Sequence, residues 1–232
     1  MTSKVKSLLL FIVISFIMIS TSKEIFSLAG NNDIFFKNGS RDEKLIALTF
    51  DDGPHPKETH EILDILDKYK VKGTFFVVGK HANWYSEPLI RAAKEGHEIG
   101  NHTFSHPDIT NLSKDDIKKE IKECEETLVK LTGKKPSLFR PPYGSYSKDK
   151  LGEIAKECGY KIILWTTIDA RDWKNPPSAQ ISNTIINKVQ NGDIILLHDY
   201  GTENTVEALN VIIPTLMERG YKFVTVSELI NK

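Results

Sequence analysis

The sequence predicts an α/β fold in which parallel strands form a barrel, and two observations carry this prediction. Short apolar runs alternate along the chain with stretches whose apolar residues recur at helical spacing, a pattern typical of repeated βα units. The chain has 232 residues, of which 40% are apolar, enough for one large core. We therefore expect a single α/β domain.

Seven apolar runs are predicted to be strands. They are residues 45–50, 74–78, 98–101, 137–140, 161–165, 193–198 and 222–225. Helical periodicity fills the segments between them, for example 117–131 and 206–216. A glycine follows several of these helical patterns, as at Gly133 and Gly159, where a left-handed cap is expected. Seven strands are one fewer than in the common eight-stranded barrel.

The first 29 residues differ from the rest and have the layout of a secretory signal. Lys4 and Lys6 precede an apolar run over residues 8–19, and small residues follow it. This run is shorter than the roughly 20 residues that span a bilayer, so residues 1–29 are either a cleaved signal peptide or an uncleaved membrane anchor. In both cases we expect a secreted or extracytoplasmic domain over residues 44–232, after a polar linker at 30–43.

Charge and cysteine content exclude some classes of protein. Lys plus Arg and Asp plus Glu both number 31, so the charge balance does not indicate nucleic-acid binding. Cys124 and Cys158 lie on apolar helix stripes, and we expect both to be buried. Export is compatible with a disulfide between them, but two cysteines do not make a disulfide framework. We expect a monomer.

Unusual polar residues lie at or just beyond the predicted strand ends. In a parallel barrel these ends meet at one face, where active sites form. The residues concerned are Asp51, Asp52, His102, His106, Arg140, Asp169, Asp172 and His198. Residues that are far apart in the sequence are thus expected to form one site.

Two histidines four residues apart, His102 and His106, would point the same way on one helical turn and offer two metal ligands. A nearby carboxylate would complete a site that leaves positions open for water and substrate, as in hydrolytic zinc centres. Asp51 and Asp52 at the end of a strand supply such carboxylates, although Asp-Gly-Pro is also an ordinary turn. Neighbouring acids can divide the roles of ligand and base, and the sequence does not assign them.

Three further segments carry candidate catalytic residues. Arg140 begins a rigid Pro-Pro-Tyr-Gly segment, where it could help to stabilise an oxyanion or form a structural ion pair. His198 ends an apolar strand beside a carboxylate, which could orient it. The segment 169–173 carries two more acids and a tryptophan.

Together the motifs TFDDGP, HTFSHP, RPPYG, DARDW and LLHD, in this order, resemble those of the polysaccharide deacetylase family. This family is also called carbohydrate esterase family four, with a NodB-homology domain. The resemblance covers residues 44–230, and it implies a distorted (β/α)7 barrel and hydrolysis of N-acetyl groups on an amino-sugar polymer.

The resemblance also implies a role for each motif residue. Asp51 would be the general base, held by Arg140, and His198 the general acid, tuned by Asp169. The metal ligands would be Asp52, His102 and His106, and the metal zinc, with Co²⁺ or another transition ion as alternatives. The backbone N–H of Tyr143 would bind the oxyanion, and Trp173 and Leu196 would line the pocket for the acetyl methyl group.

Peptidoglycan N-acetylglucosamine is the leading substrate, because an exported domain without a separate carbohydrate-binding module suits the cell's own envelope. N-acetylmuramic acid, chitin oligomers and acetylated xylan are the alternatives. Two other classes remain open: a non-catalytic carbohydrate-binding protein, and a non-haem iron oxygenase that uses a similar ligand set. Release of acetate would separate a deacetylase from both.

Overall fold

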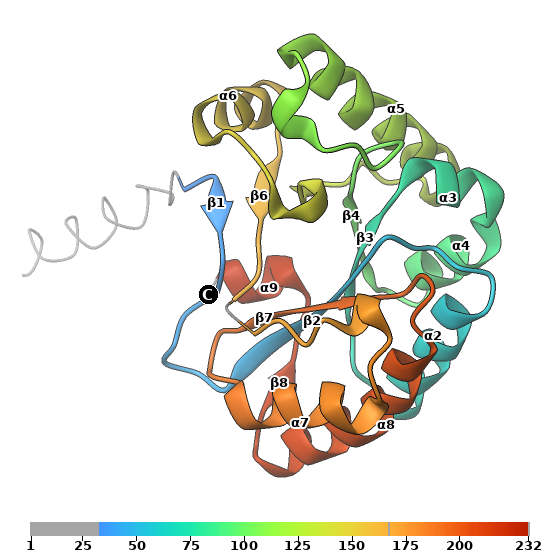
Figure 1. Ribbon diagram of the computed structural model, residues 1–232, viewed down its shortest axis with the longest axis vertical. Helices are drawn as coiled ribbons and strands as arrows, with labels where there is room; N and C mark the ends of the chain where they lie inside the picture. The colour runs from blue at the N-terminus through green and yellow to red at the C-terminus, as the bar shows by residue number, and fades with distance from the viewer. Residues whose placement is uncertain (1–32, 167, 232) are drawn as a thin grey trace, which may run out of the picture. The chain divides into compact units, whose positions relative to one another are not determined.

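Parallel strands at the centre of the structure carry the site (Figure 1). The computed structural model describes residues 33–166 and 168–231, so the expected signal or anchor at 1–29 lies outside the described residues. The strands are β1 (Phe35–Phe36), β2 (Leu45–Asp51), β3 (Thr74–Val77), β4 (Glu98–Asn101), β5 (Leu138–Phe139), β6 (Lys161–Ile163), β7 (Ile194–His198) and β8 (Lys222–Phe223).

All pairings between these strands are parallel, in the order β1-β6-β5-β4-β3-β2-β7, and β8 pairs with the start of β2. Each of the seven predicted strand segments coincides with one observed strand, β2 to β8, although β2 extends one residue further, to Asp51. Strand β1 was not predicted, and it lies in the segment that we expected to be a linker. It has two residues, and its pairing with β6 is a tertiary contact that no local pattern indicates.

The barrel is distorted because its last side is irregular. After β6 the chain leaves regular strand geometry, yet Thr166 N–H still donates to the carbonyl of Ile194 at 3.1 Å. Asp169 then forms an isolated parallel bridge with Leu196 on β7. The segment beyond β6 therefore lies along β7, and the C-terminal ends of the strands face a common rim.

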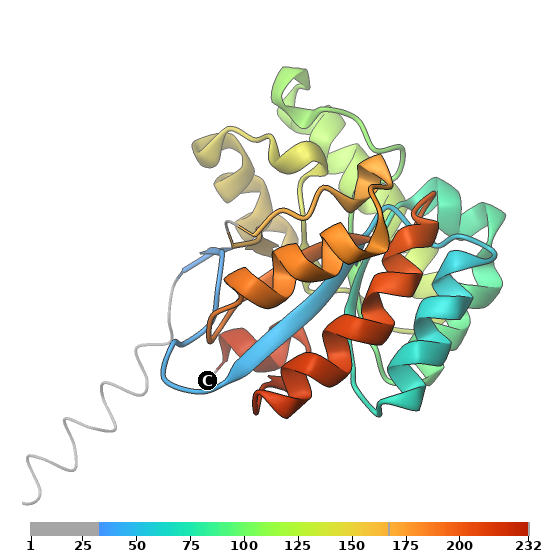
Figure 2. The same ribbon diagram turned by 60° about the horizontal axis from the view of Figure 1, so that its bottom comes forward.

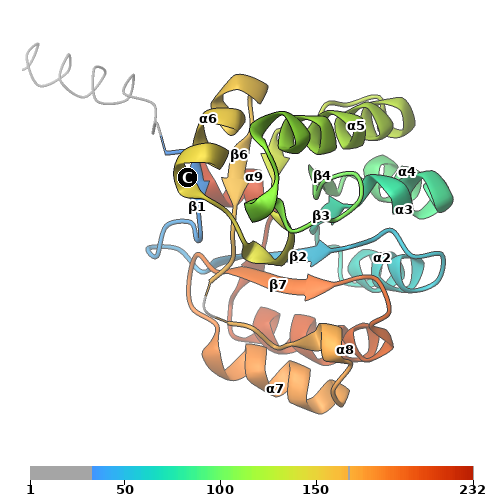
Figure 3. The ribbon, with the colours of Figure 1, turned by 45° about the horizontal axis from the view of Figure 1, so that its top comes forward.

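Helices cover the outside of the strands (Figures 2 and 3), except for the last one, whose Val226 and Leu229 pack in a separate cluster with strand residues such as Ala47 and Phe76. They are α2 (Glu58–Lys68), α3 (Gly79–Trp84), α4 (Ser86–Lys94), α5 (Lys114–Thr132), α6 (Lys148–Cys158), α7 (Ser178–Lys188), α8 (Glu203–Glu218) and α9 (Val226–Ile230). The largest core cluster lies between this layer and the sheet, with fully buried residues such as Leu48, Leu66 and Leu209. Burial of these apolar faces is the main stabilising contribution to the fold.

Local sequence signals define several helix ends. The side chain of Ser113 accepts a hydrogen bond from Asp116 N–H and caps α5, which ends at Gly133 with φ of 72°. Gly159 ends α6 in the same left-handed conformation, with φ of 77°. A glycine adopts this conformation without the steric penalty of a side chain.

The two cysteines are free thiols. Cys124 is fully buried, as expected, and burial raises the pKa of its thiol to about 12. Cys158 is only partly buried. Within residues 33–166 and 168–231, no helix has the length and apolar character needed to cross a membrane.

Candidate active site

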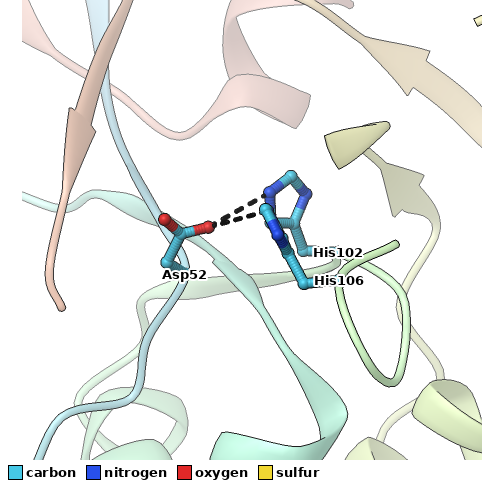
Figure 4. A group of neighbouring side chains, drawn as sticks. All are labelled: Asp52, His102 and His106. Atoms are coloured by element: carbon cyan, nitrogen blue, oxygen red, sulfur yellow. Dashed lines mark ion pairs between the residues drawn. The ribbon is translucent and has the colours of Figure 1, made fainter. Parts of the chain in front are cut away.

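Asp52, His102 and His106 converge at the rim of the barrel (Figure 4). Asp52 Oδ1 lies 3.1 Å from His106 Nε2 and 3.5 Å from His102 Nε2. Burial opposes ionisation of Asp52, but hydrogen bonding to the two histidines outweighs it and holds the pKa of this carboxyl well below its usual range. One carboxylate and two imidazoles, with donor atoms within 4.8 Å of one another, fit a divalent transition metal.

The two histidines lie on a loop after β4 and not on the helical turn that their spacing suggested. Thr103 and His106 adopt positive φ angles of 68° and 59°, which are unfavourable for residues other than glycine. Side-chain hydrogen bonds hold this conformation: His106 N–H donates to Thr103 Oγ1 at 3.0 Å. On α5, the carboxylate of Glu120 accepts from the N–H groups of Phe104 and Ser105 at 3.0 and 2.8 Å.

Hydrogen bonds also orient the imidazole rings. His102 Nδ1 lies 2.7 Å from the carbonyl oxygen of Arg140. A carbonyl can only accept, so Nδ1 carries a proton and Nε2 faces Asp52, where it can ligate a metal once it has lost its own proton. His106 Nδ1 lies 3.2 Å from the hydroxyl of Tyr143. A further histidine, His81 on α3, donates to the main-chain carbonyl of Asp52 at 2.6 Å. His81 belongs to none of the motifs quoted above.

Asp51 lies beside the metal-ligand cluster and is paired with Arg140 in the barrel interior. The guanidinium donates to Asp51 Oδ1 at 2.7 Å and to Thr49 Oγ1 at 2.8 Å. It also donates to the carbonyls of Ile163 and Leu164 at 3.3 and 3.2 Å. Burial lowers the pKa of Arg140, and the charge of Asp51 opposes this shift. Since Arg140 is fully buried, it holds Asp51 and does not face a substrate.

His198 is paired with Asp172, and this corrects the expectation that Asp169 tunes it. The Nδ1 atom of His198 lies 2.8 Å from Asp172 Oδ1, while Asp172 Oδ2 accepts from His198 N–H and from Thr205 Oγ1. Burial opposes protonation of the imidazole, but this pairing prevails and raises the pKa of His198 to about 9. Asp169 is exposed and accepts a hydrogen bond from Arg171 N–H. Of the two acids in the DARDW motif, only the second, Asp172, is turned toward His198 by the irregular backbone after β6.

Asp199, the acid beside His198 in the sequence, points away from it toward the Asp-Asp-Gly-Pro turn. It accepts from Gly53 N–H at 3.0 Å and from Thr59 Oγ1 at 2.6 Å. Burial raises the pKa of Asp199 to about 7, although these donors favour its charged form. A β-carbon at Gly53 would lie only 2.1 Å from this carboxylate, so position 53 requires glycine.

A cavity of about 440 Å³ brings together the predicted site residues other than Arg140 and Asp172. Its predicted lining residues are Asp51, Asp52, His102, His106, Tyr143, Asp169, Trp173, Leu196 and His198. Gly144 and Trp165 also line it and were not predicted, because neither is a titratable or metal-binding residue. Tyr143, with φ of 60°, and Trp173 are mostly exposed, whereas Leu196 is buried.

An α/β barrel that holds a His₂-carboxylate cluster between a buried acid and a histidine paired with a carboxylate has the groups that a metal-dependent hydrolase uses. The family model described as polysaccharide deacetylase matches residues 38–163. The chain therefore belongs to the polysaccharide deacetylase family, and it is a polysaccharide N-deacetylase.

Similar proteins share most of the chain. It is 44% identical, over 82% of its length and 89% of the other protein, to a peptidoglycan-N-acetylglucosamine deacetylase of Bacillus cereus. It is 43% identical over 81% of its length to peptidoglycan-N-acetylmuramic acid deacetylase PdaC of Bacillus subtilis, but spans only 39% of that protein. The crystal structure of the Bc1960 peptidoglycan N-acetylglucosamine deacetylase superposes with a TM-score of 0.83 at 36% identity, covering 89% of this chain and 97% of that one.

Glu120 offers a test of how the histidine loop is held. We expect Glu120→Ala to weaken binding of Zn²⁺ or Co²⁺ about ten- to a hundredfold, because the loop loses acceptors that keep His106 in place. Metal titration of the purified chain measures this effect. Glu126→Ala, an exposed position on the same helix, is the control and should bind metal normally. Equal affinities for both variants would show that Glu120 does not position the loop.

Proposed function

We propose that the protein deacetylates N-acetylglucosamine residues of peptidoglycan outside the cytoplasm, with zinc as its metal. One observation carries the proposal: the cavity that contains the metal-ligand cluster also holds Asp51 and His198, two groups suited to proton transfer. The names of the similar proteins from Bacillus support peptidoglycan as the polymer.

Zinc is the metal that this set of ligands favours, because Asp52, His102 and His106 supply one oxygen and two nitrogen donors. Cobalt or another transition ion is an alternative for the same ligands. When bound, such an ion supplies Lewis acidity, which polarises an acyl carbonyl and lowers the pKa of water. The tautomer imposed on His102 by the Arg140 carbonyl suits it to this role.

The proton carriers are proposed to be Asp51 and His198. Asp51, oriented by Arg140, accepts a proton from the attacking water. His198 is held through Nδ1 by Asp172, which leaves Nε2 to protonate the departing amine. An amine is a poor leaving group until it is protonated, so this step is required for amide hydrolysis.

The remaining lining residues are proposed to recognise the acetyl group. Tyr143 holds an unusual backbone conformation beside the cluster, and its N–H is proposed to stabilise an oxyanion. Trp173 and Leu196 supply apolar walls for the methyl group. A small pocket of this kind would discriminate against longer acyl chains.

We propose that residues 1–29 deliver the domain across the membrane, as a cleaved signal peptide or as an anchor with the catalytic domain outside. Lys4 and Lys6 before the apolar run at 8–19 support this orientation. We further propose that the protein acts as a monomer. Fractionation of the tagged full chain in its host, and its sedimentation in solution, test these two proposals. Recovery in the cytoplasm would contradict the first.

The substrate is tested by the release of acetate from three compounds. We expect kcat/KM to rise from N-acetylglucosamine to its tetramer and to purified peptidoglycan, because neighbouring sugars add binding energy that is used in the transition state. Mass spectrometry of the wall fragments then identifies the sugar that loses its acetyl group. Asp51→Asn is the inactive control. A preference for the monosaccharide over both polymers would contradict the proposal.

Removal of the metal should abolish turnover. Chelation is expected to reduce acetate release to the level of the inactive Asp51→Asn variant, and added Zn²⁺ or Co²⁺ is expected to restore it. His102→Ala removes one of three ligands and should lose stoichiometric metal, whereas His60→Ala, outside the cluster, should keep it. Full turnover with full metal content in His102→Ala would rule out the proposed ligands.

The pairing of His198 with Asp172 predicts a particular pH dependence. The acid form of His198 is present below its raised pKa of about 9 and is lost as the pH rises through it, so the rate should fall on the alkaline side. Asp172→Asn removes the charge that raises this pKa and should move the alkaline limb of kcat/KM down by about one pH unit or more. Asp169→Asn is the matched control. If only Asp169→Asn shifts the alkaline limb of kcat/KM, the pairing of His198 with Asp172 does not control the reaction.

A further inference from the structure

A second cavity, of about 890 Å³, adjoins the catalytic one and is the larger of the two. Gly144 and Trp165 line both cavities, so the two cavities share one wall. The packing of Trp165 over Gly144 is close, because a β-carbon at position 144 would lie 2.5 Å from the indole. We call this second cavity the basic groove.

The basic groove carries unbalanced positive charge. Lys37 and Lys188 line it, and neither forms an ion pair within residues 33–166 and 168–231. Arg41 also lines it, but this side chain is paired with Asp193 at 2.5 Å. Asp193 is the single carboxylate among the described lining residues, so the two lysines remain uncompensated.

These lysines lie on elements with fixed positions. Lys37 directly follows β1, where Phe36 pairs with Ile163 of β6. Lys188 is the last residue of α7, and its positive charge also stabilises the C-terminal end of that helix. Stabilisation of the helix end explains a lysine at position 188. It does not explain why Lys37 and Lys188 line the same cavity beside the catalytic site.

We propose that the basic groove binds a carboxylate carried by the sugar next to the one that is deacetylated. This inference rests on the proposed function, because peptidoglycan carries such a carboxylate and chitin does not. Chitin is neutral, whereas every second sugar of peptidoglycan carries a lactyl group that ends in a carboxylate or in a short peptide with carboxylates of its own. Lys37 and Lys188 therefore give the enzyme a preference for peptidoglycan that the acetyl pocket cannot give.

The test removes the two charges from the full chain with Lys37→Gln and Lys188→Gln together. Turnover is measured on a peptide-bearing peptidoglycan tetrasaccharide, on the same glycan with bare lactyl groups, and on the N-acetylglucosamine tetramer. We expect kcat/KM on the charged substrates to fall about three- to tenfold, mainly through KM, since each exposed ion pair contributes modestly. Turnover of the neutral tetramer should be unchanged, and Lys37→Arg with Lys188→Arg should preserve the preference.

Lys94→Gln with Lys130→Gln removes the same charge from exposed positions on α4 and α5, and it serves as the control. A loss confined to the peptide-bearing substrate would assign the carboxylate to the peptide, and a loss with bare lactyl groups would assign it to the lactyl group. An equal loss on the neutral tetramer, or in the control variant, would overturn the proposal.

Binding separates failure of the groove from failure of the proposed function. Calorimetric titration with a muramyl peptide needs no turnover, and we expect the double Gln variant to bind it more weakly than the unmodified chain. If no substrate releases acetate, the proposed function fails. The difference in affinity between the two proteins still tests whether the basic groove binds a carboxylate. Equal affinities would overturn the groove proposal whatever the turnover.

Discussion

The buried guanidinium of Arg140 is the interaction on which the site depends. It joins Asp51 and Thr49 on β2 to the carbonyls at the end of β6, and it stacks 4.0 Å from the ring of Phe76. Its own carbonyl orients His102. Removal of one partner would leave an uncompensated buried charge, which costs about 3–5 kcal/mol. Stability of the barrel and orientation of Asp51 are therefore linked.

Contacts within the fold hold the metal-ligand cluster in place. Asp52, Thr103 and His106 have positive φ angles, a conformation that costs of order 1–3 kcal/mol for each residue and persists where the surroundings impose it. Those surroundings are identifiable here. Glu120 holds the histidine loop, and Asp199 holds the turn after Asp52 through Gly53 and Thr59. The fold thus maintains the geometry that hydrolysis requires.

Opposite electrostatic environments lie on the two sides of the catalytic cavity. On one side, the two histidines hold Asp52 in its charged form. On the other, Asp172 keeps His198 protonated near neutral pH, helped by the charges of Asp51 and Asp52. Groups with separated proton affinities can serve as base and acid at one pH, and here strands β2 and β7, which are direct neighbours, position them.

The motifs and their order were sufficient to predict the family, the parallel strands and the gathering of polar residues at one rim, because strand periodicity and strand ends are local properties. The motifs could not predict contacts between segments that are distant in the sequence. Nothing local separates Asp172 from Asp169, and only the packing of the irregular segment after β6 against β7 turns Asp172 toward His198. His81 and Glu120 were missed for the same reason, since they act on backbone groups of other elements. Strand β1 and the basic groove likewise exist only because residues remote in sequence meet in the folded chain.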